Sequence, residues 1–230
     1  MSKPKAVVLL SGGLDSATVL AMAKARGFDC YTIGFDYGQK HNSELQAAHR
    51  VAEALGDHPH KLIRLDLGSI GGSALTSDEI DVPVGGVAEG GIPVTYVPAR
   101  NTVFLSIALG YGEVIGATHL FIGANAVDYS GYPDCRRTTM DALQNALSLG
   151  TDKQFEIATP LMWIDKAQTW EMASQLGGDE LVQLVTENTH TCYVGDRSRR
   201  HDRGYGCGEC PACDLREKGF TKWRKECGDV

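Results

Sequence analysis

Ala6-Val7-Val8-Leu9-Leu10-Ser11-Gly12-Gly13-Leu14-Asp15-Ser16 is the stretch that decides the fold. Residues 6–10 are continuously apolar, which predicts a buried strand of a parallel sheet that is covered on both faces. Two glycines stop this strand. From Asp15 the apolar period becomes helical, and the predicted helix ends at Gly27. The order of strand, glycine turn and helix is the opening of a βαβ unit.

The same alternation continues along the chain. A glycine-rich stretch from Gly68 to Pro93 interrupts it and predicts a long loop or insertion. We therefore expect an α/β fold: a doubly wound, mostly parallel five-stranded sheet that binds ligands at the carboxyl ends of its strands. We also expect two units, residues 1–185 and a small C-terminal subdomain of residues 186–230. The further strands are predicted over 29–35, 61–67, 119–123 and 155–161, and the helices over 42–55, 101–116, 136–149 and 165–176, the last capped by Asp165 and stopped by Gly177-Gly178.

Charge and hydropathy exclude several classes of protein. The 230 residues carry 22 Lys and Arg against 29 Asp and Glu, a net charge of −7. Such a balance does not attract nucleic acid as a whole, so binding of RNA or DNA would need a local basic patch. No apolar run approaches the roughly 18 residues that a membrane span needs, and no secretory leader is recognisable. A cytoplasmic protein without a membrane partner is expected.

The segment Ser11–Ser16 is suited to bind phosphate. Glycines let the backbone N–H groups approach an anion, and the following helix presents its positive end. The segment is neither a Walker A loop nor GxGxxG. A simple strand-to-helix turn capped by Asp15 or Ser16 is the structural alternative. Ser-Gly-Gly-x-Asp-Ser resembles the pyrophosphate-binding loop of the N-type ATP pyrophosphatases, which implies adenylation of a substrate by ATP.

Four of the seven cysteines crowd into the last fifth of the chain, and an odd number cannot pair completely in disulfides. Their number and two-residue spacers favour one structural Zn²⁺ held by four thiolates. The alternatives are an iron–sulfur cluster, free thiols or a redox pair. Cys30 is predicted to lie in a strand core and Cys227 at the surface. The predicted ligands are Cys192, Cys207, Cys210 and Cys213.

Between the first two of these cysteines lies a basic loop, residues 197–203. It is either a patch that touches RNA or an acidic partner, or a solvated loop neutralised in part by Asp196 and Asp202. The second interpretation is favoured, because sequence-independent binding needs several well-placed phosphate contacts. His201 is a conceivable ligand, but four cysteines leave it no position on the metal.

Three further segments resemble the 7-cyano-7-deazaguanine synthases of the queuosine-precursor pathway: Asp36–His41 (DYGQKH), Tyr96–Thr102 (YVPARNT) and Ile122–Arg136 (IGANAVDYSGYPDCR). The resemblance extends from about Ala6 to Cys213. It implies an adenine nucleotide alpha hydrolase-like, Rossmann-type fold and an enzyme that converts 7-carboxy-7-deazaguanine, ammonia and ATP to the nitrile. One zinc per chain, Mg²⁺ with the ATP, and a homodimer are implied too. The gap after Cys192 is longer than the family usually shows.

The resemblance and the residue types together suggest roles for individual side chains. The planar guanidinium of Arg100 suits a carboxylate or phosphate. Lys166 opens a helix, where a cation opposes the helix dipole, and this misfit suggests an anionic ligand such as the adenylate. Tyr129 or Tyr132 is a candidate to stack on the base. The candidate catalytic residues are Asp15, Ser16, Arg100 and Lys166; the nucleotide-binding residues are Leu10, Ser11, Gly12, Gly13, Leu14, Asp15, Ser16, Ala17, Thr18, Val19 and Leu20; the substrate-binding residues are Arg100, Asn101, Asp128, Tyr129, Asp134, Cys135 and Arg136.

Two other functions remain as alternatives. A tRNA-sulfurating enzyme of the same superfamily would need reactive cysteines near the nucleotide loop and a basic RNA-binding domain, whereas this chain is acidic and direct tRNA binding is not expected. A non-catalytic zinc-ribbon module would not need Asp15 and Ser16. Cys135 is expected to be a thiol that lines the substrate pocket rather than a nucleophile.

Overall fold

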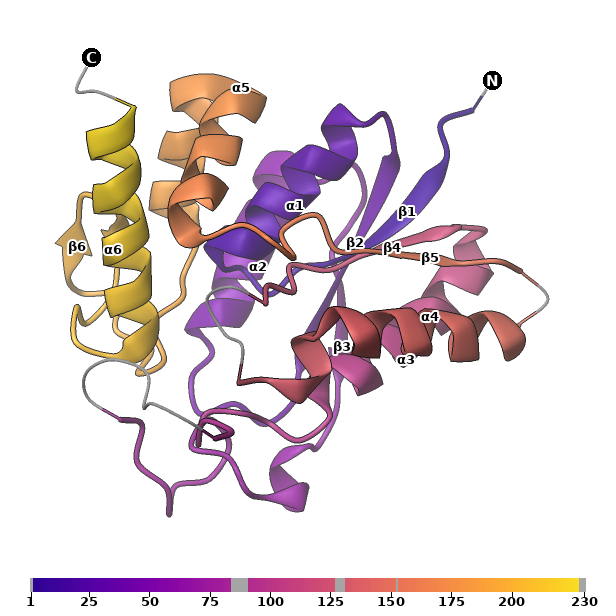
Figure 1. The fold of residues 1–230 in the computed structure, drawn as a ribbon, viewed down its shortest axis with the longest axis horizontal. Helices are drawn as coiled ribbons and strands as arrows, with labels where there is room; N and C mark the ends of the chain where they lie inside the picture. Colours follow the sequence, from indigo (N-terminus) through magenta and orange to yellow (C-terminus); the bar gives the residue numbers. More distant parts are fainter. Residues whose placement is uncertain (1, 84–90, 127–130, 152, 228–230) are drawn as a thin grey trace.

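A computed structural model describes residues 2–83, 91–126, 131–151 and 153–227. Five strands form one sheet in the order β3-β2-β1-β4-β5, and every neighbouring pair is parallel (Figure 1). The predicted α/β class and parallel sheet are therefore confirmed. The strands are β1 (Lys5–Leu9), β2 (Asp29–Asp36), β3 (Lys61–Arg64), β4 (His119–Phe121) and β5 (Glu156–Ala158).

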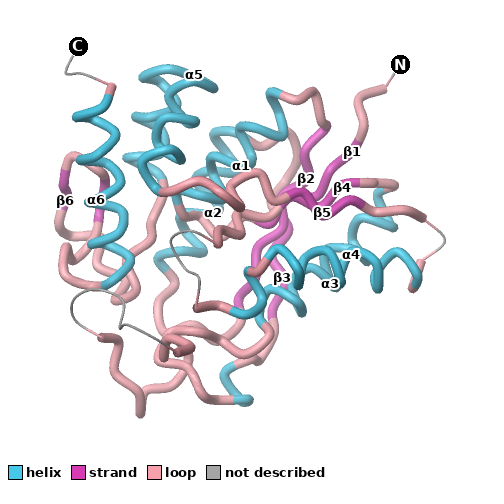
Figure 2. The backbone as a smooth tube through the Cα atoms, in the orientation of Figure 1, coloured by secondary structure: helices cyan, strands magenta, loops and turns pink. Residues whose placement is uncertain are grey.

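The central strand β1 shows why the sheet is covered on both faces. Its side chains alternate between two apolar clusters, with Ala6 and Val8 in one and Val7 and Leu9 in the other. The helices α1, α2 and α5 cover the first face, while α3 and α4 cover the second (Figure 2). Their bounds are α1 (Leu14–Ala25), α2 (Ser43–Leu55), α3 (Arg100–Ile115), α4 (Arg137–Leu149) and α5 (Lys166–Asn188).

Two edge strands are shorter than the sequence predicts. β3 ends at Arg64 instead of residue 67, because its partner β2 ends at Asp36, which pairs with Arg64. β5 covers only Glu156–Ala158 of the predicted residues 155–161 and pairs on one side with the three residues of β4. An edge strand is limited by its neighbour, so apolar residues beyond the pairing do not lengthen it.

The helix predicted to stop at Gly177-Gly178 continues after a break. Both glycines have non-helical dihedral angles, with φ of +59° at Gly178, yet α5 resumes and extends to Asn188. The predicted boundary between the two units, at residues 185 and 186, falls inside this second half. The division into two units stays a prediction.

The C-terminal segment, for which the sequence predicted a small subdomain but no individual strands or helices, completes the molecule. It consists of the hairpin β6 (Arg200–His201) and β7 (Gly204–Tyr205) and the helix α6 (Pro211–Glu226), which packs beside α5. Trp170 of α5 contacts Phe220 and Trp223 of α6, with ring centroids 5.1 and 6.0 Å apart. Among the described residues, none of the helices is both long and apolar enough to span a membrane.

The glycine-rich stretch is a loop in its described part. Residues 68–83 and 91–93 contain one short 3₁₀ turn, Gly68–Ile70, and no strand. Lys40 fastens this loop, because its N–H donates to Leu75 O at 3.1 Å and its Nζ donates to Ile80 O at 3.1 Å. A second 3₁₀ turn, Pro133–Cys135, precedes α4.

Candidate active site and metal centre

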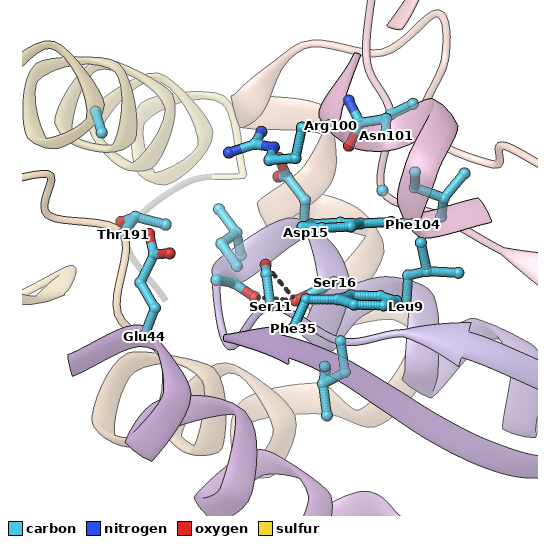
Figure 3. A pocket seen from close by; sticks show the side chains of 18 of the residues that line it. Leu9, Ser11, Asp15, Ser16, Phe35, Glu44, Arg100, Asn101, Phe104 and Thr191 are labelled. Atoms are coloured by element: carbon cyan, nitrogen blue, oxygen red, sulfur yellow. Dashed lines mark hydrogen bonds between the residues drawn. The ribbon is translucent and has the colours of Figure 1, made fainter. Parts of the chain in front are cut away.

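A cavity of about 260 Å³ opens at the carboxyl end of β1. In the sheet, β1 pairs with β2 on one side and with β4 on the other, so the strand order reverses direction at β1. The carboxyl end of β1 is therefore the switch point where open α/β sheets bind ligands. Segments from α2, α3, α5 and α6 contribute to its wall. Figure 3 shows Ser11 and Ser16 in the middle, with Glu44 and Thr191 on one side and Asn101 and Phe104 on the other.

The predicted phosphate loop has the backbone that such a loop requires. Gly12 has φ of +87°, and a Cβ there would lie 2.4 Å from Ala48 N on α2. Gly13 precedes α1 in extended conformation, and Ser16 Oγ donates to its carbonyl oxygen at 3.1 Å. Ser11 Oγ donates to Ser16 Oγ at 3.2 Å. The loop therefore presents two hydroxyls and the start of α1 to the cavity.

Only part of the predicted nucleotide segment faces this cavity. Leu10, Ser11, Gly13, Leu14, Asp15 and Ser16 line it. Gly12 is packed under α2, and its carbonyl oxygen accepts a hydrogen bond from His190 N at 2.8 Å. The remaining residues of the segment lie in the buried interior of α1 and are absent from the lining: Ala17, Thr18, Val19 and Leu20.

Lys166 does face an anion, but that anion belongs to the protein. Its Nζ lies 2.6 Å from Asp15 Oδ2 and 2.9 Å from Oδ1, and the lysine is buried. Asp165 caps the helix before it, since its side chain accepts from Gln168 N. Asp15 balances the charge that opposes the helix dipole, so the position of Lys166 does not by itself require a bound anion, and its role toward the adenylate stays a prediction.

Arg100 enters the cavity from the first turn of α3. Its Nη1 donates to Tyr37 Oη at 3.3 Å. Burial alone would lower the pKa of Arg100, but Tyr37, Tyr132 and Asp134 raise it above its usual range, so the guanidinium stays charged. Arg100 is therefore a permanent cation that faces the cavity together with Lys166.

The residue before Arg100 has a strained backbone. Ala99 has φ of +54°, the left-handed region that L-residues avoid, and is the one described non-glycine residue with positive φ. Its N–H donates to Tyr96 Oη at 2.9 Å, which holds this turn at the start of α3. Strain of this kind persists where the surrounding structure fixes a functional residue.

Ala99→Val is expected to lower the free energy of unfolding by about 1–2 kcal/mol, because a β-branched side chain worsens the left-handed conformation. Urea denaturation measures the change. Ala142→Val, at an exposed position of α4, is the control and should cost no more than about 0.7 kcal/mol through helix propensity. Equal effects at the two positions would show that the left-handed turn carries no strain.

The predicted substrate residues other than Arg100 separate into four groups. Asn101 and Cys135 line the cavity, where Asn101 Nδ2 lies 3.2 Å from Cys135 Sγ. Asp134 is buried outside the lining: its Oδ2 accepts from Asn101 N at 2.9 Å, and its Oδ1 has no partner among the described residues. Arg136 is exposed at the cap of α4. Asp128 and Tyr129 lie outside the described residues.

Cys135 has the character of a pocket-lining thiol. Burial, followed by the Asp134 carboxylate, raises its pKa to about 12. The thiol is therefore protonated at neutral pH and is a poor nucleophile. Tyr132 lines the same wall, with its hydroxyl 2.7 Å from Thr95 Oγ1.

Several lining residues were missed by sequence reasoning. Phe35 and Phe104 stack with centroids 4.0 Å apart. Phe104 follows Arg100 by one helical turn, a signal that the sequence contained. Arg216 is buried on α6 and donates to Thr189 Oγ1 at 2.9 Å and Thr191 Oγ1 at 3.4 Å, so the C-terminal helix is tied to this wall. Glu44 and Thr191 belong to the same lining.

The four predicted cysteine ligands come together beside this cavity. Their Sγ atoms all lie within 4.8 Å of one another, and Cys207 Sγ is 3.9 Å from Cys213 Sγ. A tetrahedral zinc–thiolate site separates its sulfurs by about 3.8 Å, so the donor set fits Zn²⁺. Backbone N–H groups of Glu209 and Cys210 point at Cys207 Sγ at 3.4 and 3.3 Å. His201 lies outside the set, since its Nε2 is 2.9 Å from Gly206 O.

Cys30, Cys227 and the basic loop of residues 197–203 lie in the structure much as the sequence predicted. Cys30 is buried in β2 and Cys227 is exposed. The arginines of the loop pair within the chain: Arg200 with Glu187 at 2.6 Å, Arg199 with Asp196 and Glu209, and Arg203 with Glu217. Three of the four arginines of the loop are thus neutralised internally, by Asp196 as predicted and by three glutamates that were not. Arg197 instead donates to the backbone carbonyl of Glu187, and no ion pair of Asp202, the other predicted partner, is found among the described residues.

Comparison with known proteins now identifies the family. The family model described as "Queuosine biosynthesis protein QueC" matches residues 5–224. The chain belongs to the QueC family. It is 50% identical to the 7-cyano-7-deazaguanine synthase of Alkalilimnicola ehrlichii, with 96% of each chain covered, and 53% identical to that of Cellvibrio japonicus, with 96% of this chain and 95% of that one covered. Among solved structures it resembles NMN synthetase from Francisella tularensis (TM-score 0.48, 12% identity, 100% of this chain and 88% of that one covered).

Membership of the QueC family confirms the resemblance inferred from Asp36–His41, Tyr96–Thr102 and Ile122–Arg136. It also makes the chain an ATP-dependent enzyme of queuosine biosynthesis. The roles of its individual residues are developed below.

Proposed function

We propose that this QueC family member converts 7-carboxy-7-deazaguanine, ammonia and ATP to 7-cyano-7-deazaguanine in two activation steps. In the first, the carboxylate attacks the α-phosphorus of ATP, pyrophosphate leaves, and ammonia replaces AMP to give the amide. In the second, the amide oxygen is adenylated and leaves with AMP as the nitrile forms. One observation carries the proposal: the Ser11–Ser16 loop, Arg100 and Lys166 face one cavity at the switch point of the sheet.

The loop is proposed to hold the phosphates that leave as pyrophosphate. Ser11 and Ser16 supply hydroxyl donors, and the start of α1 supplies N–H groups and a favourable dipole. Mg²⁺, held mainly by the phosphates of ATP, would offset their charge. Asp15 and Glu44 are the carboxylates among the described lining residues, and Asp15 is the one within the loop.

Lys166 and Arg100 are proposed to stabilise the charge that moves during adenylation. Lys166 is held by Asp15 in the wall of the cavity, so its charge is already oriented and can stabilise the α-phosphate without reorganisation. Arg100 lies between the loop and the residues proposed for substrate, where its planar guanidinium suits the carboxylate to be activated. Phe35 and Phe104 give this side an apolar surface on which a planar base can rest.

The four-cysteine centre is proposed to hold one structural Zn²⁺ through Cys192, Cys207, Cys210 and Cys213. When bound, the ion supplies no catalytic group but fixes the segment that follows α5 and the start of α6. From the family resemblance we also infer a homodimer that acts on small molecules in the cytoplasm. The internally paired loop of residues 197–203 supports the absence of direct tRNA binding.

Purified protein incubated with ATP, Mg²⁺, ammonium and 7-carboxy-7-deazaguanine is expected to release AMP and pyrophosphate and to form first the amide and then the nitrile. Mass spectrometry of the base and chromatography of the nucleotides measure both. Omission of the deazaguanine should suppress AMP release. Zinc-loaded protein that yields neither AMP nor amide would refute the proposal.

A further inference from the structure

Glu44 is an unusual side chain in this cavity. Among the described residues, the other charged groups of the lining are three cations, Arg100, Lys166 and Arg216, and the carboxylate of Asp15, which Lys166 already neutralises. Such a cavity is suited to anions, as a site for ATP and a carboxylate must be. A second carboxylate without a lysine partner weakens the binding of anions, so its presence calls for a cation or a proton as its own ligand.

The position of Glu44 is fixed by the phosphate loop. It lies in the first turn of α2, and the backbone there is in contact with Gly12, whose Cβ would lie 2.5 Å from Glu44 O. The side chain extends along one side of the cavity toward Thr191 (Figure 3). Among the described residues, no hydrogen bond or ion pair engages its carboxylate, and Glu44 therefore presents its oxygens to a ligand in the cavity.

Burial and the neighbouring charged groups bring the pKa of Glu44 close to neutral pH. Burial is the main cause that raises its pKa to about 7; the Arg100 guanidinium on α3 opposes this rise, and Cys192 beyond Thr191 makes a smaller contribution to it. Among the described residues, Tyr37, after β2, also interacts with Glu44. A carboxyl group with this pKa accepts and releases protons readily at physiological pH, which is what a general base requires.

The proposed reaction has one positively charged reactant. Ammonium is the main form of ammonia at neutral pH, and it has no lone pair with which to attack the adenylate carbonyl. It must first be bound among cations and then lose a proton. Glu44, which in the described part of the lining is the carboxylate without a lysine partner, meets both needs.

We propose that Glu44 is a catalytic residue that binds ammonium in the cavity and accepts its proton, so that neutral ammonia attacks the acyl adenylate. This inference rests on the proposed function. The nitrogen–carbon bond forms, the bond from carbon to the AMP oxygen breaks, and AMP leaves with the electron pair. The nitrogen loses a second proton to become the amide, which Glu44 accepts after passing the first to solvent.

The same carboxylate is placed to act in the second activation. There the bond from carbon to the adenylated oxygen breaks, and the amide nitrogen loses both of its protons as the triple bond forms. The amide nitrogen occupies the position of the attacking ammonia, so it lies beside Glu44. One general base thus serves the nitrogen in both steps.

The test compares two nucleophiles with Glu44→Gln. Hydroxylamine is mostly unprotonated at neutral pH and attacks the same adenylate to give a hydroxamate, so it needs no base to generate the nucleophile. With ammonium the variant is expected to lose on the order of 10²-fold in turnover, the usual contribution of a general base. With hydroxylamine, hydroxamate formation should stay close to the wild-type rate.

Glu53→Gln is the matched control, because Glu53 lies exposed on the same helix and pairs with His49 outside the cavity. It should react normally with both nucleophiles. Equal losses of Glu44→Gln with ammonium and hydroxylamine would overturn the proposal in favour of a structural or Mg²⁺-binding role, and unchanged rates with both would also overturn it.

Thermal unfolding establishes that the variant is folded. Should Glu44→Gln fail to fold, Glu44→Asp retains a base at a longer distance, and the proposal then requires a loss with ammonium that exceeds the loss with hydroxylamine. Wild-type protein that releases no AMP with either nucleophile would refute the proposed function instead, so the two failures are distinguishable.

Discussion

Lys166→Met is expected to lower kcat by about 10²- to 10³-fold, the effect of removing one preorganised charge from a site where negative charge develops. The buried ammonium lies 2.6 Å from Asp15 and faces the cavity beside the phosphate loop. The same change removes the cation that pairs with Asp15. Because Asp15 is partly exposed, the loss of unfolding free energy should be about 3 kcal/mol, at the lower end for a broken buried pair. AMP release and urea denaturation measure the two effects.

The double variant Asp15→Asn, Lys166→Met separates catalysis from stability. Neither member of the pair is then charged, so the unfolding free energy should recover toward the wild-type value, since a buried ion pair contributes little net stability. Turnover should stay as low as in Lys166→Met. A double variant that regained turnover would show that the ion pair only supports the fold and that Lys166 does not act on phosphate.

The fold could be predicted from the sequence where local patterns and tertiary structure agree. Residues 6–16 contain the central strand, the turn and the first helix, and each has its own local signal. The second half of α5 had no such signal, because Gly177-Gly178 is a valid stop and the chain resumes its helix only by packing on α1 and α6. The lengths of the two edge strands, β3 and β5, are likewise set by the strands with which they pair and not by their own residues.

The candidate site was predictable in its residue types but not in its pairings. The four cysteines follow from spacing alone, and the structure gathers them. Lys166 was noticed for a charge that opposes the helix dipole, yet the sequence does not reveal that Asp15, far away along the chain, balances it. Glu44 was overlooked because a glutamate in the first turn of a helix is common, since its charge is favourable beside the positive end of the helix dipole. Only the fold shows that Glu44 faces the same cavity as three cations and that, among the described lining residues, it is the carboxylate without a lysine partner.

Removal of the metal is expected to weaken ATP binding as well as the fold. Purified protein should contain about one zinc per chain, and iron with a visible absorption band would contradict the assignment. His190 N donates to Gly12 O at 2.8 Å, and Thr191 Cγ2 would touch a Cβ on Gly13, so the segment before Cys192 supports the phosphate loop. Loss of one such backbone bond, worth about 1 kcal/mol, predicts an ATP affinity roughly fivefold to tenfold lower.

Chelation and Cys207→Ser should give the same result, because both remove a closed set of four ligands. Calorimetric titration with ATP and thermal unfolding, each with the zinc content measured by elemental analysis, test this. Cys227→Ser is the control, since this thiol is exposed and outside the metal centre. If zinc-free protein melts earlier but binds ATP with unchanged affinity, the contact of His190 with Gly12 does not couple the two sites. If affinity falls with the metal, the centre is part of the nucleotide site, because it fixes one wall of the loop that holds the phosphates.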